Sequence, residues 1–435
     1  MERHPTGPGR ARPGAVGRAF ARIPGTEIQS ALPARTTVMN LLESLAQSLL
    51  CRALARWRGS QLVLELPDGD RRRFGPAGGR EFGITVHRRR AFLRIVQGGT
   101  TGAGESYMDG DWSTDDLPGL IAAALQNTAA MRLDGPLSLG QRVIDLARHR
   151  RRANSRAGSE KNIHAHYDLG NEFFRLFLDA DTLAYSCAIF EPGDDLAAGQ
   201  SRKFEAICQR LGLGPGDHVL EIGCGWGGFA IHAARTRGCR VTGITISHEQ
   251  QRLARERVES AGLSGQISIE YCDYRDVAGE FDHIVSIEMF EAVGKEYWDE
   301  FFAVCARTLR PGGQMLMQTI AIPDSGRDNA LRASGWISKY IFPGGILPAV
   351  AEIDESLQRS GGDLSIEHER EIGPHYVRTL LEWRERFLAV LPQVREIGFD
   401  DRFIRMWDFY LSSCAGAFEA RSIRDVQLLL QRTRA

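Results

Sequence analysis

The stretch from Val219 to Ala230 constrains this chain more than any other part of it. The residues are Val-Leu-Glu-Ile-Gly-Cys-Gly-Trp-Gly-Gly-Phe-Ala: an apolar segment with an acidic residue near its end, a glycine-dense turn and the start of a helical pattern. A turn this tight needs residues without a clashing Cβ, and it lets a ligand approach the backbone closely. We interpret it as the first β-turn-α unit of a doubly wound α/β fold, with a nucleoside-like ligand at the carboxyl end of the strand.

The glycines of this turn admit more than one ligand. Gly223, Gly225 and Gly228 match the G-x-G-x-x-G pattern of dinucleotide sites. The next predicted strand, however, ends in Thr245 and Ser247 and lacks the Asp or Glu that would hold a ribose 2′-hydroxyl in such a site. An acid before the turn and uncharged polar residues after the second strand favour S-adenosylmethionine. A dinucleotide site and a purely structural turn stay open as alternatives.

Composition sets wider bounds. A chain of 435 residues with 43% hydrophobic and 25% charged residues is expected to form two globular domains. No stretch approaches the roughly 20 apolar residues of a membrane-spanning helix, so any membrane contact should be peripheral. The eight cysteines are scattered without metal-like spacing, which predicts reduced thiols, a cytoplasmic location and no metal site.

The organisation along the chain follows from changes of pattern. We expect a disordered basic arm over residues 1–37, a small N-terminal α+β domain over 38–147, a basic linker over 148–161 and a catalytic domain over 162–435. In the N-terminal domain we predict a helix over 38–60, strands over 61–66, 81–86 and 91–96, and further helix over 115–150. In the catalytic domain the predicted strands are 217–222, 239–245, 266–271, 281–287 and 313–320. Their alternation with helical patterns predicts a mostly parallel sheet, and segment 330–392 should supply helices over the substrate side.

Several further motifs occur in one order along the chain. They are His164–Leu169, Tyr185–Ala188, Gly243–Ser247 with Gln250, Met289–Glu291, Trp336–Gly345, Pro374–Tyr376 and Cys414–Phe418. Together with the glycine turn they resemble the cyclopropane fatty acid synthase family of S-adenosylmethionine-dependent methyltransferases, which includes the mycolic acid cyclopropane synthases. Glu105–Gly110 resembles the smaller leading domain of longer members. The resemblance implies a class I, Rossmann-like methyltransferase domain behind an N-terminal domain that delivers lipid or mediates self-association.

The resemblance implies an unusual reaction. A cis double bond in a phospholipid acyl chain attacks the methyl group of S-adenosylmethionine, and the resulting carbocation loses a proton to a base. In the family this base is a bicarbonate ion, and the matching groups here are Cys187, Glu291, Gln318, Tyr376 and the backbone of Ile320. Gln318 stands where ring-forming members usually carry His, and an amide cannot titrate. A cyclopropane and a methylene branch, later reduced to a methyl branch, therefore both stay open as products.

The resemblance also assigns a cofactor site. Its residues are Tyr185, Ser186, Glu221, Gly223, Cys224, Gly225, Gly227, Thr245, Ile246, Gln250, Asp273, Tyr274 and Ile287. Amides of the turn can bind the methionyl carboxylate, Thr245 and Gln250 can reach the ribose, and Asp273 can accept from the adenine amino group. Cys414 resembles a cysteine once assigned a catalytic role in the family, and we favour a packing role for it in the C-terminal helix over that catalytic role. Glu288 is expected to be a supporting or surface group, and Trp336, Tyr340, Phe342 and Trp383 could line an acyl tunnel or belong to the core.

The expected partners follow from this reaction. They are a membrane phospholipid with unsaturated acyl chains, the inner leaflet as a peripheral surface, a second copy of the chain and, for a methylene product, a reductase. The arginine clusters 71–73, 88–90 and 148–156 are solvated faces or contacts to anionic lipid. Nucleic acid is not an expected partner of a chain with net charge −1. A methyltransferase of a soluble small molecule and a catalytically silent lipid-binding relative are the alternative functions.

Overall fold

The computed structural model describes residues 32–131, 169–326 and 335–433. The predicted linker 148–161, most of the predicted arm 1–37 and the histidines at 164 and 166 lie outside these ranges. The contacts divide the chain into a first unit that ends at Leu42 and a compact unit from Glu43 to Ala435. Helix α1 (Leu32–Leu54) runs across this division and begins before the predicted helix start at residue 38.

A four-stranded sheet with the order β2-β1-β3-β4 organises the first part of the larger unit. The elements are β1 (Gln61–Glu65), β2 (Arg71–Phe74), β3 (Glu81–Val86), α2 (Arg90–Met108), β4 (Trp112–Ser113) and α3 (Leu117–Asn127). Strand β1 pairs antiparallel with β2 and parallel with β3. The predicted strands 61–66 and 81–86 are therefore confirmed, whereas the arginine-rich edge strand β2 is not among the predictions.

The predicted strand over 91–96 is wrong, because these residues form the first turns of helix α2. The fully buried carboxylate of Asp111 accepts hydrogen bonds from Arg90 and Arg94 at 2.9–3.1 Å. A helix brings residues i and i+4 to one face, so both arginines reach this carboxylate. Asp111 lies outside residues 91–96, so the alternation of apolar and polar residues within this segment does not indicate the contact.

The catalytic sheet has seven strands in the order β10-β11-β9-β8-β5-β6-β7. Strands β5 (His218–Ile222), β6 (Arg240–Thr245), β7 (Ile267–Tyr271), β8 (Phe281–Ile287) and β9 (Leu309–Ala321) are parallel to one another and confirm the five predicted strands. Strands β10 (Leu364–Glu371) and β11 (Arg424–Arg432) add an antiparallel edge that the prediction lacks. The predicted doubly wound α/β architecture is confirmed.

Helices cover both faces of this sheet. Helices α7 (Leu196–Leu211), α8 (Gly228–Arg237) and α9 (His248–Ser260) share one apolar cluster with Val219, and α10 (Trp298–Thr308) and α12 (Val350–Arg359) share another with Leu220. Neighbouring residues of β5 thus point into different cores, as expected of a parallel strand that is buried on both faces.

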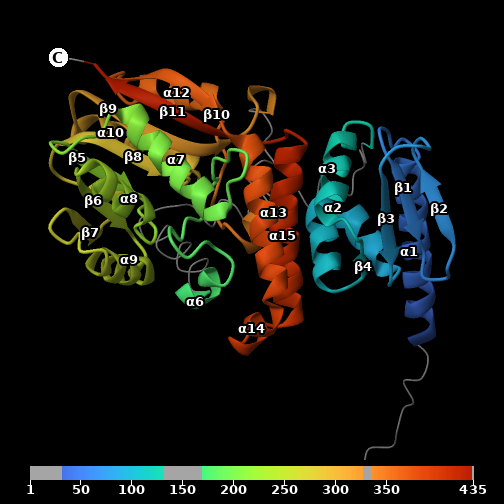
Figure 1. Cartoon of the computed structure of the whole chain (residues 1–435). Coiled ribbons are helices and arrows are strands. Elements are labelled where there is room, and N and C mark those ends of the chain that lie inside the picture. Colours follow the sequence, from blue (N-terminus) through green and yellow to red (C-terminus); the bar gives the residue numbers. More distant parts are fainter. Residues whose placement is uncertain (1–31, 132–168, 327–334, 434–435) are drawn as a thin grey trace, which may run out of the picture. The chain divides into compact units, whose positions relative to one another are not determined.

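The remaining described helices lie beside the site. They are α6 (Gly170–Arg175), α11 (Trp336–Tyr340), α13 (Gly373–Ala389), α14 (Leu391–Glu396) and α15 (Asp401–Glu419), with short 3-10 turns at Tyr274–Asp276, Phe290–Ala292, Lys295–Tyr297 and Asp324–Gly326. Helices α13 and α15 lie side by side (Figure 1). Segment 330–392 therefore supplies the predicted helices and, in addition, strand β10. Within the described ranges, no helix has both the length and the apolar character that crossing a bilayer requires.

Candidate active site

The candidate site lies where the strand order reverses, between β5 and β8. At such a point the chain leaves the two central strands in opposite directions and a ligand crevice opens at their carboxyl ends. A cavity of about 1700 Å³ is lined by the glycine turn after β5, the residues after β6 and the segment after β8. Apart from Gly227, every predicted cofactor residue lies on the wall of this cavity.

The glycine turn has the backbone that its sequence predicts. Its φ angles are 83° at Gly223, 52° at Gly225 and 79° at Gly227, a region that favours glycine. The amides of Gly223 and Cys224 both donate to the carbonyl of Ile244 at 3.0 Å. These two amides hold the turn against β6, so they are not the groups that would bind a cofactor carboxylate.

Glu221 is a buried acid with an unused oxygen. The residue is 3% exposed, and Oε2 has no hydrogen-bond partner among the described residues. Burial raises the pKa of Glu221 well above its usual range. A buried oxygen that lacks a donor at the end of β5 fits the ammonium group of the methionyl part of S-adenosylmethionine, because that ammonium supplies both donors and a compensating charge.

The predicted ribose and adenine side chains are held in place by their neighbours. Thr245 donates to Oε1 of Gln250 at 2.8 Å, and both side chains are buried. The carboxylate of Asp273 accepts from Nε and Nη2 of Arg275 at 2.8 and 2.7 Å. Arg275 therefore fixes the carboxylate that was predicted to meet adenine, and an adenine amino group would share it with the guanidinium.

Three of the groups predicted to bind bicarbonate converge on a carboxylate of the chain itself. Oε1 of Glu288 accepts from the backbone N–H of Cys187 and from Nε2 of Gln318, each at 2.8 Å. Oε2 of Glu288 accepts from the hydroxyl of Tyr376 at 2.5 Å. Gln318 also donates to Asp425 at 3.1 Å. Glu288, expected as a supporting or surface group, is the centre of this network.

Glu291 binds the other predicted group. Its Oε1 accepts from the amide of Ile320 at 2.5 Å and from the hydroxyl of Thr319 at 2.9 Å. Its Oε2 is buried and has no partner among the described residues. Burial, together with the negative charge of Glu288, raises the pKa of Glu291 to about 7. The five predicted groups therefore form two neighbouring carboxylate sites rather than one open anion site.

The two predicted cysteines differ in position. The thiol of Cys187 is fully buried and donates to the carbonyls of Ala188 and Ile372 at 3.2 and 3.7 Å, so only its backbone amide joins the Glu288 network. Cys414 lies on the cavity wall, and burial raises its pKa to about 12. Both thiols are neutral near pH 7, which argues against a thiolate nucleophile at either position.

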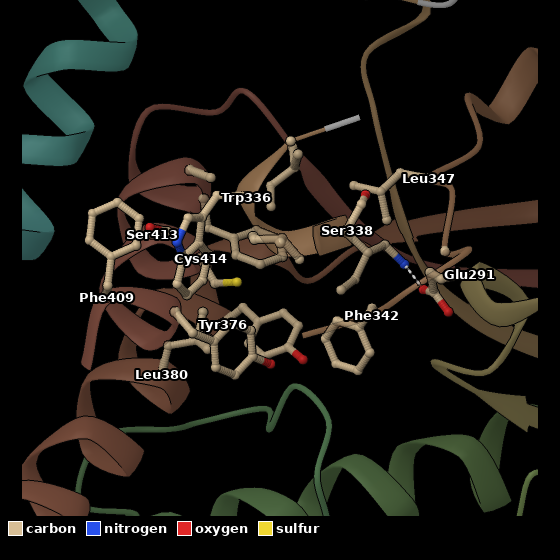
Figure 2. A pocket seen from close by; sticks show the side chains of 18 of the residues that line it. Glu291, Trp336, Ser338, Phe342, Leu347, Tyr376, Leu380, Phe409, Ser413 and Cys414 are labelled. Carbon is tan, nitrogen blue, oxygen red and sulfur yellow. Dashed lines mark hydrogen bonds between the residues drawn. The ribbon is translucent and has the colours of Figure 1, made fainter. Parts of the chain in front are cut away.

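An apolar wall continues from these groups. Figure 2 shows Trp336, Phe342, Leu380 and Phe409 around the same cavity as Tyr376 and Cys414, with Glu291 at one end. Trp383 is instead part of the core and is fully buried against Tyr185, with ring centroids 5.2 Å apart. Tyr340 is not on the wall, and its hydroxyl donates to Glu105 at 2.9 Å.

Three ionisable residues of this region have positions that the sequence interpretation does not predict. Glu288 carries a usable signal, since it follows β8 at the carboxyl edge of the sheet, where functional groups gather. Asp425 belongs to β11, a strand that was not predicted. Lys203 lies on α7, is fully buried and donates to Oγ of Ser186 at 2.5 Å, with its pKa lowered by burial to about 8. Its place on an amphipathic helix gave no sign of burial.

Fold and site together define an S-adenosylmethionine-dependent methyltransferase of class I. Solved structures agree: a mycolic acid cyclopropane synthase, CmaA1, complexed with SAH and CTAB, is 31% identical and has a TM-score of 0.58 over 63% of this chain and 98% of that one. Coclaurine N-methyltransferase, at 20% identity and a TM-score of 0.59 over 76% of this chain and 98% of that one, shares the fold.

Sequence comparisons identify the family. The family described as mycolic acid cyclopropane synthetase matches residues 154–428. The cyclopropane-fatty-acyl-phospholipid synthase of Escherichia coli is 41% identical over 78% of this chain and 85% of its own length. The tuberculostearic acid methyltransferase UfaA1 of Mycobacterium tuberculosis is 39% identical over 86% of this chain and 89% of its own length. The chain belongs to the cyclopropane fatty acid synthase family, as its motifs predicted.

Proposed function

We propose that this methyltransferase transfers a methyl group from S-adenosylmethionine to a cis double bond in an acyl chain of a membrane phospholipid. One observation carries the proposal: a single cavity has the predicted cofactor residues on one part of its wall and apolar side chains with Glu288 and Tyr376 on another. At about 1700 Å³ it is larger than the roughly 300–1,000 Å³ of usual small-molecule pockets, so it has room for a long chain beside the cofactor.

The wall suits an alkene as the nucleophile. S-adenosylmethionine supplies an electrophilic methyl group, and an alkene needs no general base to attack it. The contribution of the protein is to exclude water and to align the double bond with the methyl group. The aromatic faces of Tyr376, Trp336 and Phe342 lie around the cavity in Figure 2, where they can stabilise positive charge on the attacked chain.

The product depends on how the cation loses a proton. Loss from the transferred methyl group closes a cyclopropane ring, whereas a hydride shift followed by proton loss gives a methylene branch, which a reductase partner would convert to a methyl branch. One relative is named as a tuberculostearic acid methyltransferase and another as a cyclopropane-fatty-acyl-phospholipid synthase. Bicarbonate is the base that the family implies. To occupy the predicted site it would have to displace Glu288 from Cys187, Gln318 and Tyr376.

The decisive experiment is mass spectrometry of lipids. Purified protein is incubated with S-adenosylmethionine and vesicles of dioleoyl phospholipid, and the fatty acid methyl esters are separated by gas chromatography. We expect a new ester that is heavier by one CH₂ unit. Mild hydrogenation adds H₂ to a methylene branch and leaves a cyclopropane intact, which separates the isomers. Turnover of a water-soluble acceptor in the absence of lipid, or no release of S-adenosylhomocysteine with any acceptor, would support the alternative functions.

We further propose that the protein meets the inner leaflet through helix α1. Six of its apolar side chains are 41–61% exposed, and all of them except Met39 recur at helical spacing: Val38, Leu41, Leu42, Leu45 and Leu49. The arginine clusters contribute less than their number suggests, because Arg71, Arg72 and Arg89 form ion pairs with Glu65, Asp70 and Asp68. Self-association into a homodimer stays a prediction, which light scattering after size-exclusion chromatography tests.

A further inference from the structure

Glu288 has a backbone conformation that its side chain does not favour. Its φ is 48°, in the left-handed region that glycine occupies freely. A non-glycine residue held in such a region costs free energy, and such residues gather at functional sites. The conformation directs the carboxylate of Glu288 at the end of β8 toward the donors described above, so the side chain has a use that offsets this cost.

The donors around Glu288 are those of an anion site. An amide N–H, a side-chain amide and a phenol hydroxyl donate three hydrogen bonds of 2.5–2.8 Å to its two oxygens. An ionised carboxylate has about four lone-pair sites, and these three donors use three of them. The carboxylate has the charge and the planar oxygen pair of bicarbonate, and it binds three of the groups that bicarbonate was predicted to bind. The predicted bicarbonate site therefore already contains an anion, the carboxylate of Glu288.

The neighbouring groups are donors or neutral acids. Burial and the nearby charge of Glu288 raise the pKa values of Tyr376 and Asp425 well above their usual ranges, so neither competes as a base near pH 7. Glu291 accepts from Ile320 and Thr319 through Oε1 alone, and its Oε2 has no partner among the described residues. Lys203, the buried cation of this region, lies close enough to Glu288 to be influenced by its charge. Glu288 is therefore the acid of this cluster that has donors on both of its oxygens and also lines the cavity.

The carboxylate also has access to the substrate. Glu288 and Tyr376 lie on the wall of the cavity, together with Cys414 and the apolar side chains of Figure 2. Cys187 and Gln318, which hold the carboxylate, are not on that wall and are fully buried. The arrangement exposes the base to the cavity and keeps two of its donors behind it.

We propose that the carboxylate of Glu288 is the proton acceptor of the reaction and takes the place of a diffusible bicarbonate ion. The inference rests on the proposed function. The alkene π pair forms the new C–C bond as the C–S bond breaks, and the bonding pair of the latter stays on sulfur. For a cyclopropane, a C–H bond of the transferred methyl group breaks and its electron pair forms the bond to the cationic carbon. For a methylene branch, a hydride first moves from the methyl-bearing carbon to the cationic carbon, and the electron pair of a methyl C–H bond then forms the double bond. In both cases the proton goes to an oxygen of Glu288.

The test compares two substitutions that remove the charge but differ in the space they leave. Glu288→Gln keeps the volume of the side chain. Glu288→Gly suits the positive φ and leaves a hole lined by the amide of Cys187, the amide of Gln318 and the hydroxyl of Tyr376. Methylation of dioleoyl phospholipid vesicles is measured in buffer freed of carbon dioxide, then with added bicarbonate or formate. Calorimetry of S-adenosylmethionine binding reports whether each variant is folded.

We expect wild-type turnover that does not change when bicarbonate is removed or restored. Both variants should bind the cofactor and lose at least about 100-fold in turnover, the usual contribution of a positioned base. Added bicarbonate or formate should restore about tenfold of this loss in Glu288→Gly and none in Glu288→Gln. A purely structural role for Glu288 would not produce this difference between the variants.

Each contrary result has a separate meaning. Wild-type turnover that rises with bicarbonate, or a Glu288→Gln variant that stays active, overturns the assignment of Glu288 while the proposed function stands. A Glu288→Gly variant that no anion restores overturns the anion-replacement argument. Wild-type protein that forms no methylated lipid under any of these conditions overturns the proposed function, and the inference about Glu288 falls with it.

Discussion

At the scale of single residues, Glu221 offers a direct test of the cofactor site. Its unpartnered Oε2 is expected to accept from the ammonium of S-adenosylmethionine. Glu221→Gln should therefore weaken cofactor binding by about 10- to 100-fold, since a hydrogen bond to a charged group contributes about 1.5–3 kcal/mol. Calorimetry measures the effect. Glu288→Gln is the matched control, because Glu288 is assigned to the proton and not to the cofactor. Equal affinities for wild type and Glu221→Gln would contradict this role.

A second residue-scale prediction concerns pH and Glu291. Its pKa of about 7 lies above the usual glutamate pKa of 4.5, so between these two pH values the folded protein holds a proton that the unfolded chain releases. The stability due to this proton is fully present below about pH 4.5 and is lost as the pH rises through about 7, with a magnitude on the order of 3 kcal/mol. The glutamine of Glu291→Gln is neutral at every pH, so this variant should keep that stability at alkaline pH.

Thermal unfolding at about pH 5 and about pH 8 checks this sign. The melting temperature of Glu291→Gln, relative to wild type, should be higher at the alkaline value than at the acid one. Glu396→Gln, which changes an exposed carboxyl, serves as the control. A difference between Glu291→Gln and wild type that stays the same at both pH values would show that Glu291 ionises as freely in the folded protein as in the unfolded chain.

The sequence predicts which residues belong to the site better than it predicts how their side chains contact one another. Local motifs placed Thr245, Tyr376 and Glu291 on the cavity wall. They could not show that Glu288 takes the donors of Cys187 and Gln318, because this depends on a left-handed backbone angle and on strand register. Hydrogen bonds between residues 30 and 101 positions apart leave no trace in a local pattern.

At the scale of elements, helix α1 can be tested for membrane contact. Leu41→Glu with Leu45→Glu places two charges on its exposed apolar face, where both side chains are more than half exposed. Folding should be unaffected, since little burial is lost, while co-sedimentation with anionic vesicles should fall by about tenfold or more. Cofactor binding in solution should be unchanged. Wild-type co-sedimentation by the double variant would show that another surface meets the lipid.

Helices and strands are predicted correctly from the sequence where their own residues determine them, and are missed where distant residues do. Among the five parallel strands, the central strand β5 buries both faces and is visible as an apolar run, whereas the edge strand β7 alternates buried and exposed residues. Strands β10 and β11 are different: β10 is mostly exposed beyond Leu364, and β11 follows helix α15 with no turn signal of its own. The prediction of a strand over residues 91–96 of helix α2 is wrong because Asp111, which accepts hydrogen bonds from Arg90 and Arg94, lies after the helix.

At the scale of the whole molecule, the walls of the cavity link elements far apart in the sequence. Leu120 and Ala124 of α3 line it, as do Phe409 and Cys414 of α15. The two helices touch at Gly416, where an added Cβ would lie 2.8 Å from the carbonyl oxygen of Pro118 and 2.9 Å from the amide of Ala122. Backbone atoms cannot yield as a flexible side chain can, so α3 and α15 would have to separate.

Gly416→Ala should therefore destabilise the protein by about 1–3 kcal/mol and lower lipid methylation more than cofactor affinity, because the separation opens the acyl part of the wall and spares the turn after β5. Denaturant unfolding and calorimetry measure the two effects. Gly83→Ala is the control, since a Cβ there has no atom within 4 Å. If Gly416→Ala matched this control in stability and turnover, α3 would be free to move away from α15, and the acyl cavity would not depend on the contact between them.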